Sequence, residues 1–252
     1  MKQKTQSAVD NPSQKSQKLG KRELLSECSG KRFYRFDKPD LIVQEHVDAD
    51  AVEGRKESRK SINPLRNRIS SYLFTYLDGF HIPTHFVSRI SDTEMLVKKL
   101  EMIPISVRIY NVACGALLKR FVIRDGTSLE FPIIEHYHKS TGKTPTWLNE
   151  YHIVALGIAT PAEFKQINRI TSKANAVLRS LCDRRKLMLA ELQLEFGRYK
   201  EAIVIGDELS PVTIRFLDME QENKSQKDRI SPENPDQYEV YSALSDRLEL
   251  KI

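Results

Sequence analysis

The chain has 252 residues, which is enough for one large domain or two small ones around a buried core. Hydrophobic residues make up 40% of it and charged residues 29%, and it contains no apolar run of about 18 residues, which excludes a membrane-spanning helix. Its formal net charge of +6 makes nucleic acid or another anion a candidate partner, so the position of this charge along the chain matters.

The first 20 residues form a basic, polar segment. Through Arg22 the chain holds six basic residues against Asp10 alone, so +5 of the net charge lies there and the remainder carries only +1. Lys, Gln and Ser dominate the segment, and its few apolar side chains cannot offset the entropy cost of folding. We therefore predict a disordered basic tail over residues 1–20, a solubilising extension more than a nucleic-acid-binding arm. The nearly neutral body does not favour nucleic acid as a partner.

The body alternates short runs of β-branched and aromatic residues with a few longer helical patterns, which is typical of the α+β class. Apolar residues from Leu65 to Leu77 recur at helical steps after Pro64, so a helix is expected there. A second helix is expected over residues 162–184 and a third over residues 238–248. The expected strands cover residues 31–36, 41–47, 85–90, 95–100, 103–112, 187–196 and 202–205.

Two groups of cations lie in the first half of the body. Lys31 and Arg32 follow Gly30 at the head of an expected strand, although a GxxxxGK[ST] phosphate loop is absent. Lys98 and Lys99 interrupt an otherwise apolar run, so one of them can point into a phosphate-bearing cleft while the other turns to solvent. The alternative is that both are solvated lysines of an edge strand.

The segment from Leu192 to Pro211 has the pattern of a strand, a tight turn and a second strand, with Glu195 and Asp207 near the strand ends. Two carboxylates brought together across a hairpin repel each other unless a cation lies between them. Mg²⁺ is a cation that binds one or two carboxylates together with phosphate oxygens. The alternative is a plain hairpin with solvated acids, because spacing alone is a weak signal.

Two features bear on the cellular compartment. The first residues lack the apolar segment of a secretory signal peptide. Cys28, Cys114 and Cys182 lie far apart and show neither metal-ligand nor redox spacing, which suits unpaired thiols in a reducing environment. We expect a cytoplasmic protein that does not associate with membranes.

Several stretches resemble, in sequence and in order, the SAICAR synthetase family of ligases, which join aspartate to a carboxylated aminoimidazole ribotide. The resemblance runs from about Gly30 to Arg229 and implies an α+β fold of two lobes with ATP and Mg²⁺ in the cleft between them. It places an N-terminal nucleotide-binding lobe at residues 21–101 and a C-terminal lobe with the metal and substrate sites at residues 102–252. The matching stretches are SGK, PDLIV, GFHIPTHFV, SDTEMLVKKLEMIPI, NVACGALLKR, LQLEFGRYK, IGDELSPVTIR and KDR.

In this family ATP phosphorylates a substrate carboxylate and an amine then attacks the acyl phosphate, which requires cations around the transferred phosphoryl group. The resemblance implies that Lys31, Lys98 and Met102 contact ATP and that Glu195 and Asp207 hold Mg²⁺. Arg32 joins the expected cofactor-binding set because it follows Lys31. The expected catalytic residues are Lys98, Arg215 and Glu191, and the expected substrate-binding residues are Tyr110, Asn111, Gln193, Arg215 and Lys227.

The region that resembles the ribotide site departs from the family pattern. The usual arginine and serine are Tyr110 and Ala116 here, so a cation and a hydroxyl are missing. Gln193 stands where the family has a lysine, Val212 stands where it has an acid, and residues 139–147 contain no acid. Loss of a guanidinium from a phosphate site forfeits about 2 kcal/mol or more. Because the changes gather in one pocket, they predict a weakened ribotide site.

This pattern favours an ATP-dependent carboxylate–amine ligase that forms an amide through an acyl phosphate on a non-purine substrate, in antibiotic or toxin biosynthesis. Intramolecular lactam closure, as attributed to a branch of this superfamily that makes tabtoxin, would need no separate amine site. The alternatives are a standard SAICAR synthetase of purine biosynthesis and a non-catalytic regulatory or scaffold paralogue. We expect small-molecule carboxylate and amine substrates, and a homo-oligomer is compatible with the sequence.

Overall fold

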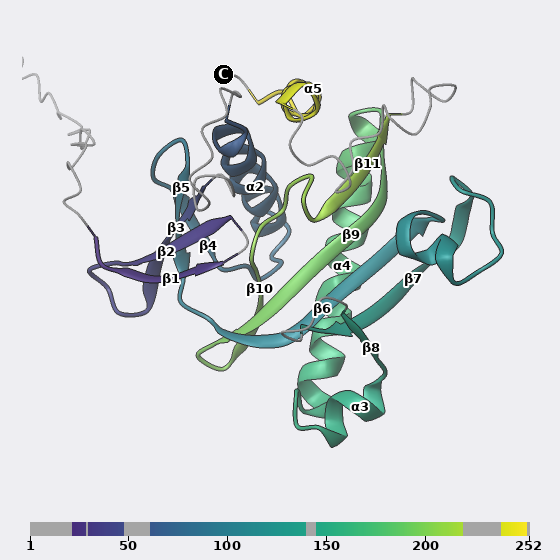
Figure 1. Ribbon diagram of the computed structural model, residues 1–252, viewed down its shortest axis with the longest axis horizontal. Helices are drawn as coiled ribbons and strands as arrows, with labels where there is room; N and C mark the ends of the chain where they lie inside the picture. The colour runs from purple at the N-terminus through teal and green to yellow at the C-terminus, as the bar shows by residue number, and fades with distance from the viewer. Residues whose placement is uncertain (1–21, 29, 48–60, 140–144, 219–237, 251–252) are drawn as a thin grey trace, which may run out of the picture.

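The computed structural model describes residues 22–28, 30–47, 61–139, 145–218 and 238–250. Within them the chain forms two antiparallel sheets and a few helices (Figure 1), which confirms the predicted α+β class. The predicted tail over residues 1–20 and the candidate substrate residue Lys227 lie outside the described residues. Among the described helices, none is both long and apolar enough to cross a membrane.

The first sheet has five strands in the order β1-β2-β3-β5-β4. Its register pairs Lys31 with His46 and Phe33 with Gln44, which places Lys31, Gln44 and His46 on one face. All three of these polar side chains are buried. The strands are β1 (Leu24–Cys28), β2 (Lys31–Arg35), β3 (Leu41–His46), β4 (Phe86–Arg89) and β5 (Glu94–Lys98).

The second sheet has six strands in the order β10-β9-β6-β7-β8, with β11 also paired to β9. The long strands β6 and β9 lie at its centre, and the predicted hairpin is the antiparallel pair of β9 and β10. The strands are β6 (Glu101–Val112), β7 (Ser128–His138), β8 (Thr146–Leu148), β9 (Leu187–Tyr199), β10 (Ala202–Gly206) and β11 (Ile214–Asp218).

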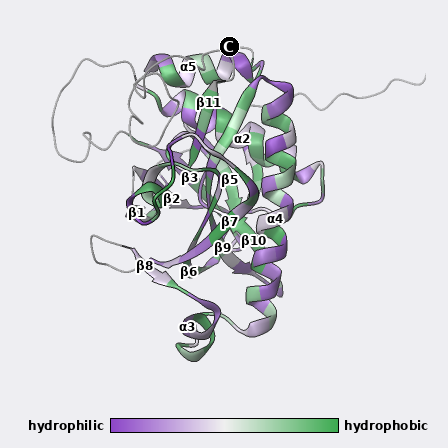
Figure 2. Cartoon of the chain, turned by 90° about the vertical axis from the view of Figure 1, so that its right-hand side faces the viewer, coloured by the Kyte–Doolittle hydropathy of each residue, from purple (hydrophilic) through white to green (hydrophobic). Residues whose placement is uncertain are grey.

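Helix α4 (Pro161–Arg184) runs along the second sheet (Figure 2). It begins at a capping box, in which Thr160 and Glu163 each accept a hydrogen bond from the other's backbone N–H. Helix α2 (Asn63–Asp78) has Pro64 in its first turn, as predicted. The other helices within the described residues are the 3₁₀ helix η1 (Gly115–Lys119), α3 (Glu150–Ala155) and α5 (Tyr238–Arg247).

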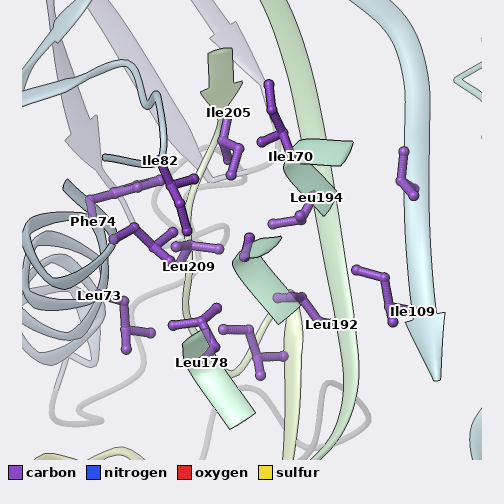
Figure 3. Packing of buried hydrophobic residues seen from close by; sticks show 14 of the residues in the cluster. Leu73, Phe74, Ile82, Ile109, Ile170, Leu178, Leu192, Leu194, Ile205 and Leu209 are labelled. Carbon is purple, nitrogen blue, oxygen red and sulfur yellow. The ribbon is translucent and has the colours of Figure 1, made fainter. Parts of the chain in front are cut away.

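The apolar stripes of α2 and α4 meet the second sheet in a continuous core (Figure 3). Burying each such side chain stabilises the fold by about 1.5–3 kcal/mol relative to exposure. The core therefore fixes the position of β9 and β10 relative to α2. Its labelled members include Leu73 and Phe74 of α2, Ile170 and Leu178 of α4, and Leu192 and Leu194 of β9.

The segment before β4 joins the two sheets directly. Thr84 forms a parallel bridge with Ile205 of β10, and the backbone N–H of His85 donates to the Ile205 carbonyl at 2.8 Å. The backbone N–H of Ile205 in turn donates to the Pro83 carbonyl at 2.9 Å. These bonds hold the C-terminal end of β10 beside the first sheet, where residues of both sheets can meet.

All seven predicted strands and all three predicted helices are present, with ends shifted by a few residues. The prediction missed β1, β7, β8, β11, α3 and η1. Strand β1 is exposed along its whole length, and β8 has only 3 residues, so neither has a strong apolar pattern. The predicted boundary between lobes at residues 101 and 102 stays a prediction, although the first sheet ends at Lys98 and the second begins at Glu101.

Candidate functional site

One face of the second sheet carries a row of polar side chains, called the site face below. In the register of β6 and β9, residues directly opposite each other point to the same side, and alternate residues along each strand share that side. The intervening residues, such as Leu192 and Leu194, turn to the core under α4. The site face consists of Ser106 opposite Glu195, Arg108 opposite Gln193, and Tyr110 opposite Glu191.

The two predicted metal-binding acids lie together at one end of this face. Glu195 pairs across the hairpin with Gly206, and Asp207 follows Gly206 directly with a left-handed φ of 65°. Burial and the nearby charge of Asp207 raise the pKa of the Glu195 carboxyl, whereas Lys139 opposes this rise. The carboxyl of Glu195 is therefore short of positive charge, which fits the place of a bound cation.

Mg²⁺ fits this pair of acids by its donor chemistry. The ion prefers hard oxygen ligands and keeps several waters or phosphate oxygens when it binds one or two carboxylates. Among the described residues no group of three or more His, Cys, Asp or Glu side chains could form an all-protein metal site. Glu195 and Asp207 would therefore hold the ion together with phosphate oxygens of a nucleotide.

A buried cluster of charges links Asp207 to the first sheet and to α2. The Lys31 ammonium of β2 donates to the Asp207 carboxylate and, at 3.1 Å, to Oε1 of Glu208. The Arg66 guanidinium of α2 donates hydrogen bonds to both carboxylate oxygens of Glu208, at 2.7 and 2.6 Å. Ser210 Oγ donates to the same carboxylate at 2.8 Å. One fully buried acid thus holds two cations from two other elements in place.

The charges in this cluster support one another. Burial alone would lower the pKa of Lys31, but Glu208 and Asp207 outweigh it and raise the pKa. Burial likewise opposes ionisation of Glu208, yet Lys31 and Arg66 keep its pKa well below the ordinary value. His85, which is fully enclosed near Lys31 and Lys98, has its pKa lowered to about 3, mainly by burial, and is neutral at pH 7.

The remaining predicted nucleotide contacts lie around the end of β10. The Lys98 ammonium donates to the Thr84 carbonyl at 2.8 Å and stands 5.5 Å from the centre of the Tyr199 ring. Met102 is 45% exposed, and its Sδ would be 3.6 Å from a Cβ added at Gly206. Met102 therefore forms an open apolar surface next to Gly206, as a purine ring would require.

Lys139 at the end of β7 is a cation that the sequence did not single out. Its ammonium donates to Oε2 of Glu195 at 2.5 Å, and its side chain is 48% exposed. A half-exposed ion pair of this kind is worth about 1 kcal/mol or less. Lys139 would therefore compete only moderately with a metal ion for the Glu195 carboxylate.

We expect Lys139→Met to lower the Mg²⁺ concentration needed for half-maximal activity about threefold to fivefold, because the competing ammonium is gone. A titration of activity against Mg²⁺ at saturating ATP measures this shift. Lys99→Met, which removes an exposed lysine side chain and leaves the backbone hydrogen bond from Lys99 to the Asp40 carbonyl in place, is the matched control. An unchanged or increased Mg²⁺ requirement in Lys139→Met would show that Lys139 does not compete with the ion.

At the other end of the site face, Glu191 and Arg215 form a buried ion pair. Arg215 Nε lies 3.4 Å from Glu191 Oε2. Gly115, with φ of +54°, lies so close that an added Cβ would be 3.2 Å from Glu191 Oε2 and from Arg215 Nη2. The Cys114 Sγ donates weakly to Glu191 Oε2 at 3.9 Å. The pair is thus fixed by the loop that begins η1.

The structure separates the other predicted substrate residues. Tyr110 is fully buried on the site face, and burial together with Glu191 raises the pKa of its hydroxyl. Gln193 is partly exposed on the same face. Asn111 lies on the opposite face, where its carboxamide forms reciprocal hydrogen bonds of 2.8 and 2.9 Å with Asn175 of α4. This corrects the prediction for Asn111, because both halves of its amide are already bound in the core.

Arg32 also points away from the predicted cofactor site. It follows Lys31 along β2 and therefore points to the other face of the sheet, where it lies opposite Glu45 of β3 in the strand register. Its Nε donates to Oε2 of Glu27 at 2.9 Å. Its assignment to ATP came only from its position next to Lys31, and the period of the strand puts the two side chains on opposite faces. Lys31 is therefore the one of the pair that faces Asp207.

Sequence reasoning missed Arg66, Arg108, Lys139 and Glu208. The alternation of the predicted strand over residues 103–112 places Arg108 on the same face as Tyr110, so that signal was present. Glu208 follows Asp207 directly, but nothing in its spacing separates a buried acid from a solvated one. Arg66 and Lys139 reach the site from other elements, which only tertiary structure shows.

Comparisons with known proteins agree on one family. The family model of SAICAR synthetase matches residues 24–246. A phosphoribosylaminoimidazole-succinocarboxamide synthase from Chlorobaculum parvum is 41% identical over 233 residues, which cover 91% of this chain and 99% of that protein. The crystal structure of the synthase of the same name from Ehrlichia chaffeensis superposes with a TM-score of 0.80 at 30% identity, covering 91% of this chain and 100% of that one. A SAICAR synthetase solved in complex with ADP gives the same TM-score and identity, with 91% and 98% coverage.

Proposed function

The chain belongs to the SAICAR synthetase family, and on this premise we propose that it is the purine-biosynthetic ligase that joins aspartate to a carboxylated aminoimidazole ribotide. As a member of the family it is an ATP-dependent, amide-forming ligase that uses ATP and Mg²⁺. The observation that carries the proposal is the 41% identity, over 99% of its length, to a relative named for this reaction.

The proposal replaces the non-purine ligase that the altered pocket favoured. Further relatives at 38% and 39% identity, also matched over 99% of their length, carry the same synthase name. These names point to purine biosynthesis and not to the specialised-metabolite interpretation. The alternative reading, a standard SAICAR synthetase, is therefore the better supported one, and the departures at Tyr110 and Gln193 need another explanation.

The nucleotide end of the site suits phosphoryl transfer to a carboxylate. Lys31 and Lys98 would place two cations on the ATP phosphates, and Met102 would lie against the adenine. Glu195 and Asp207 would hold Mg²⁺, which neutralises charge on the transferred phosphoryl group when it is bound. Burial around Lys31 limits water there, which strengthens each of these contacts.

The other end of the site face suits the ribotide. Arg215 is a buried guanidinium beside Glu191, able to bind an anionic oxygen while its partner fixes its orientation. Gln193 lies midway between this pair and Glu195, so a substrate that spans the face passes over it. The substrate carboxylate would then lie at the metal end, where it receives the phosphoryl group before the aspartate amine attacks.

The proposal is tested by turnover of the purified full chain with the carboxylated ribotide, aspartate and Mg-ATP. We expect ADP release that requires both organic substrates, together with formation of the succinocarboxamide product. Omission of aspartate and omission of the ribotide are the controls. The absence of ADP release from the complete mixture would reject the proposed substrates.

A further inference from the structure

Arg108 is a site-face cation that no part of the proposed mechanism uses. It lies on β6 opposite Gln193, between the row of Glu195 and the row of Glu191. Its guanidinium carbon is 5.1 Å from the centre of the Tyr137 ring, and it lies next to the Tyr110 hydroxyl. The Nε atom is buried and has no hydrogen-bond partner in the described part of the chain. A partly buried guanidinium with an unsatisfied N–H lowers the stability of the fold unless a ligand accepts the missing hydrogen bond.

Each of the described acids around Arg108 has another cation as its ion-pair partner. Glu135 accepts from Arg120 Nη2 at 2.5 Å and from Tyr137 at 2.6 Å. Glu191 pairs with Arg215 and Glu195 pairs with Lys139. Arg108 makes no ion pair within the described ranges, so its positive charge has no carboxylate partner on this face. A surplus guanidinium on a substrate-binding face indicates an anionic ligand.

The position of Arg108 also bears on the replaced arginine. Residues 108 and 110 are two apart on one strand and therefore point to the same face, with side chains about 7 Å apart along the strand. A long arginine side chain spans much of that distance. The cation missing at Tyr110 is thus supplied one row closer to Glu195, while Tyr110 fills the space in which a guanidinium would lie.

We propose that Arg108 binds an anionic group of the ribotide, its phosphate or its carboxylate, and so sets the specificity of the site for this substrate. The inference rests on the proposed function. Arginine binds both phosphate and carboxylate through two parallel N–H donors, and Tyr137 holds one side of the guanidinium plane in position. The altered residues of the pocket then represent relocation of a cation and not loss of substrate binding.

The first experiment compares wild type with Arg108→Leu and Arg108→Lys. We expect the KM for the ribotide to rise about 10- to 100-fold in Arg108→Leu, with the KM for ATP unchanged, and to recover in part in Arg108→Lys. The double variant Arg108→Leu/Tyr110→Arg moves the guanidinium to position 110 and should restore ribotide binding. Arg35→Leu, in which an exposed arginine of β2 loses its partner Glu23, is the matched control.

Two further measurements identify which anion Arg108 binds and test the inference separately from the proposed function. If the phosphate is the ligand, the effect of Arg108→Leu disappears with the unphosphorylated riboside, and if the carboxylate is the ligand, the effect persists. Absence of wild-type turnover would reject the proposed function, and calorimetric binding of ribose 5-phosphate to wild type and Arg108→Gln then tests the site by itself. An unchanged ribotide KM in a folded Arg108→Leu overturns the inference, and so does equal affinity of wild type and Arg108→Gln for both ribose 5-phosphate and the carboxylated ribotide.

Discussion

Replacing Glu195 by glutamine should lower Mg²⁺-dependent turnover by about 1000-fold, which corresponds to a loss of about 4 kcal/mol of transition-state stabilisation. Glutamine keeps the shape of the side chain but removes the anionic oxygen that would hold the ion beside the phosphates. The protein should nevertheless stay as stable as wild type. Burial and Asp207 raise the pKa of Glu195, which means that its charge costs stability in the folded protein and that removing the charge relieves this cost.

This combination separates a metal ligand from a structural acid. The loss of turnover is measured as activity against Mg²⁺ concentration. The stability is measured by thermal unfolding of the metal-free protein. Glu101→Gln on neighbouring β6, whose side chain is 75% exposed and pairs with Arg198, controls for loss of a carboxylate. Glu195 would lose its metal assignment if the variant kept turnover within about threefold of wild type.

The fold was largely predictable because its main elements have strong periodic patterns. The apolar stripes from Leu65 to Leu77 and along residues 162–184 define α2 and α4, and both bury those stripes in the core. Strand β11 was missed because its five residues lie after a Pro-containing turn and pair only with the far end of β9. Its position depends on a long-range contact that no local pattern encodes.

The candidate site was predictable only where residues lie close in sequence or match a family motif. Glu195 and Asp207 flank one hairpin, so their proximity follows from the turn. Asn111 belongs to the same motif as Tyr110, but the two-residue period of the strand turns it into the core against Asn175. A motif identifies a stretch of chain, whereas the alternation of the strand decides which of its side chains face the ligand.

The altered pocket shows how a sequence pattern can mislead about function. Compared position by position, the change at Tyr110 reads as the loss of a cation. Compared by face, the same strand still presents a guanidinium at Arg108. A binding site requires charge at a place in space, and two positions of one strand can serve the same place. If Arg108 binds the ribotide as proposed, substitutions counted along the sequence overstate the change in the site.

The second large effect is expected at Glu208. Glu208→Leu should lower the free energy of unfolding by about 3–5 kcal/mol, because it removes the buried carboxylate that pairs with both Lys31 and Arg66. Urea unfolding measures the loss. Turnover should fall as well, since Lys31 then binds Asp207 alone and loses the contact that orients it.

A double-mutant cycle with Arg66→Met tests the pairing itself. The double variant should cost clearly less than the sum of the two single changes, because each single change leaves a charge that the double variant removes. Arg35→Leu combined with Glu208→Leu is the control cycle and should be additive, because Arg35 is exposed and pairs elsewhere. Additivity in the first cycle would contradict a direct energetic link between Arg66 and Glu208.

The same cluster predicts how stability depends on pH. The pKa of Glu208 is lowered in the folded state, so its contribution is present above the unfolded value of about 4.3 and is lost as the pH falls toward the folded value. The pKa of Lys31 is raised, so its contribution is present below about 10.4 and is lost only as the pH rises beyond that. Wild type should thus lose stability at both extremes of pH. In Glu208→Leu, the free energy of unfolding measured with urea should fall less steeply between pH 7 and pH 3. If the free energy of unfolding of this variant fell as steeply as that of wild type, other carboxylates would be responsible for the loss of stability at low pH.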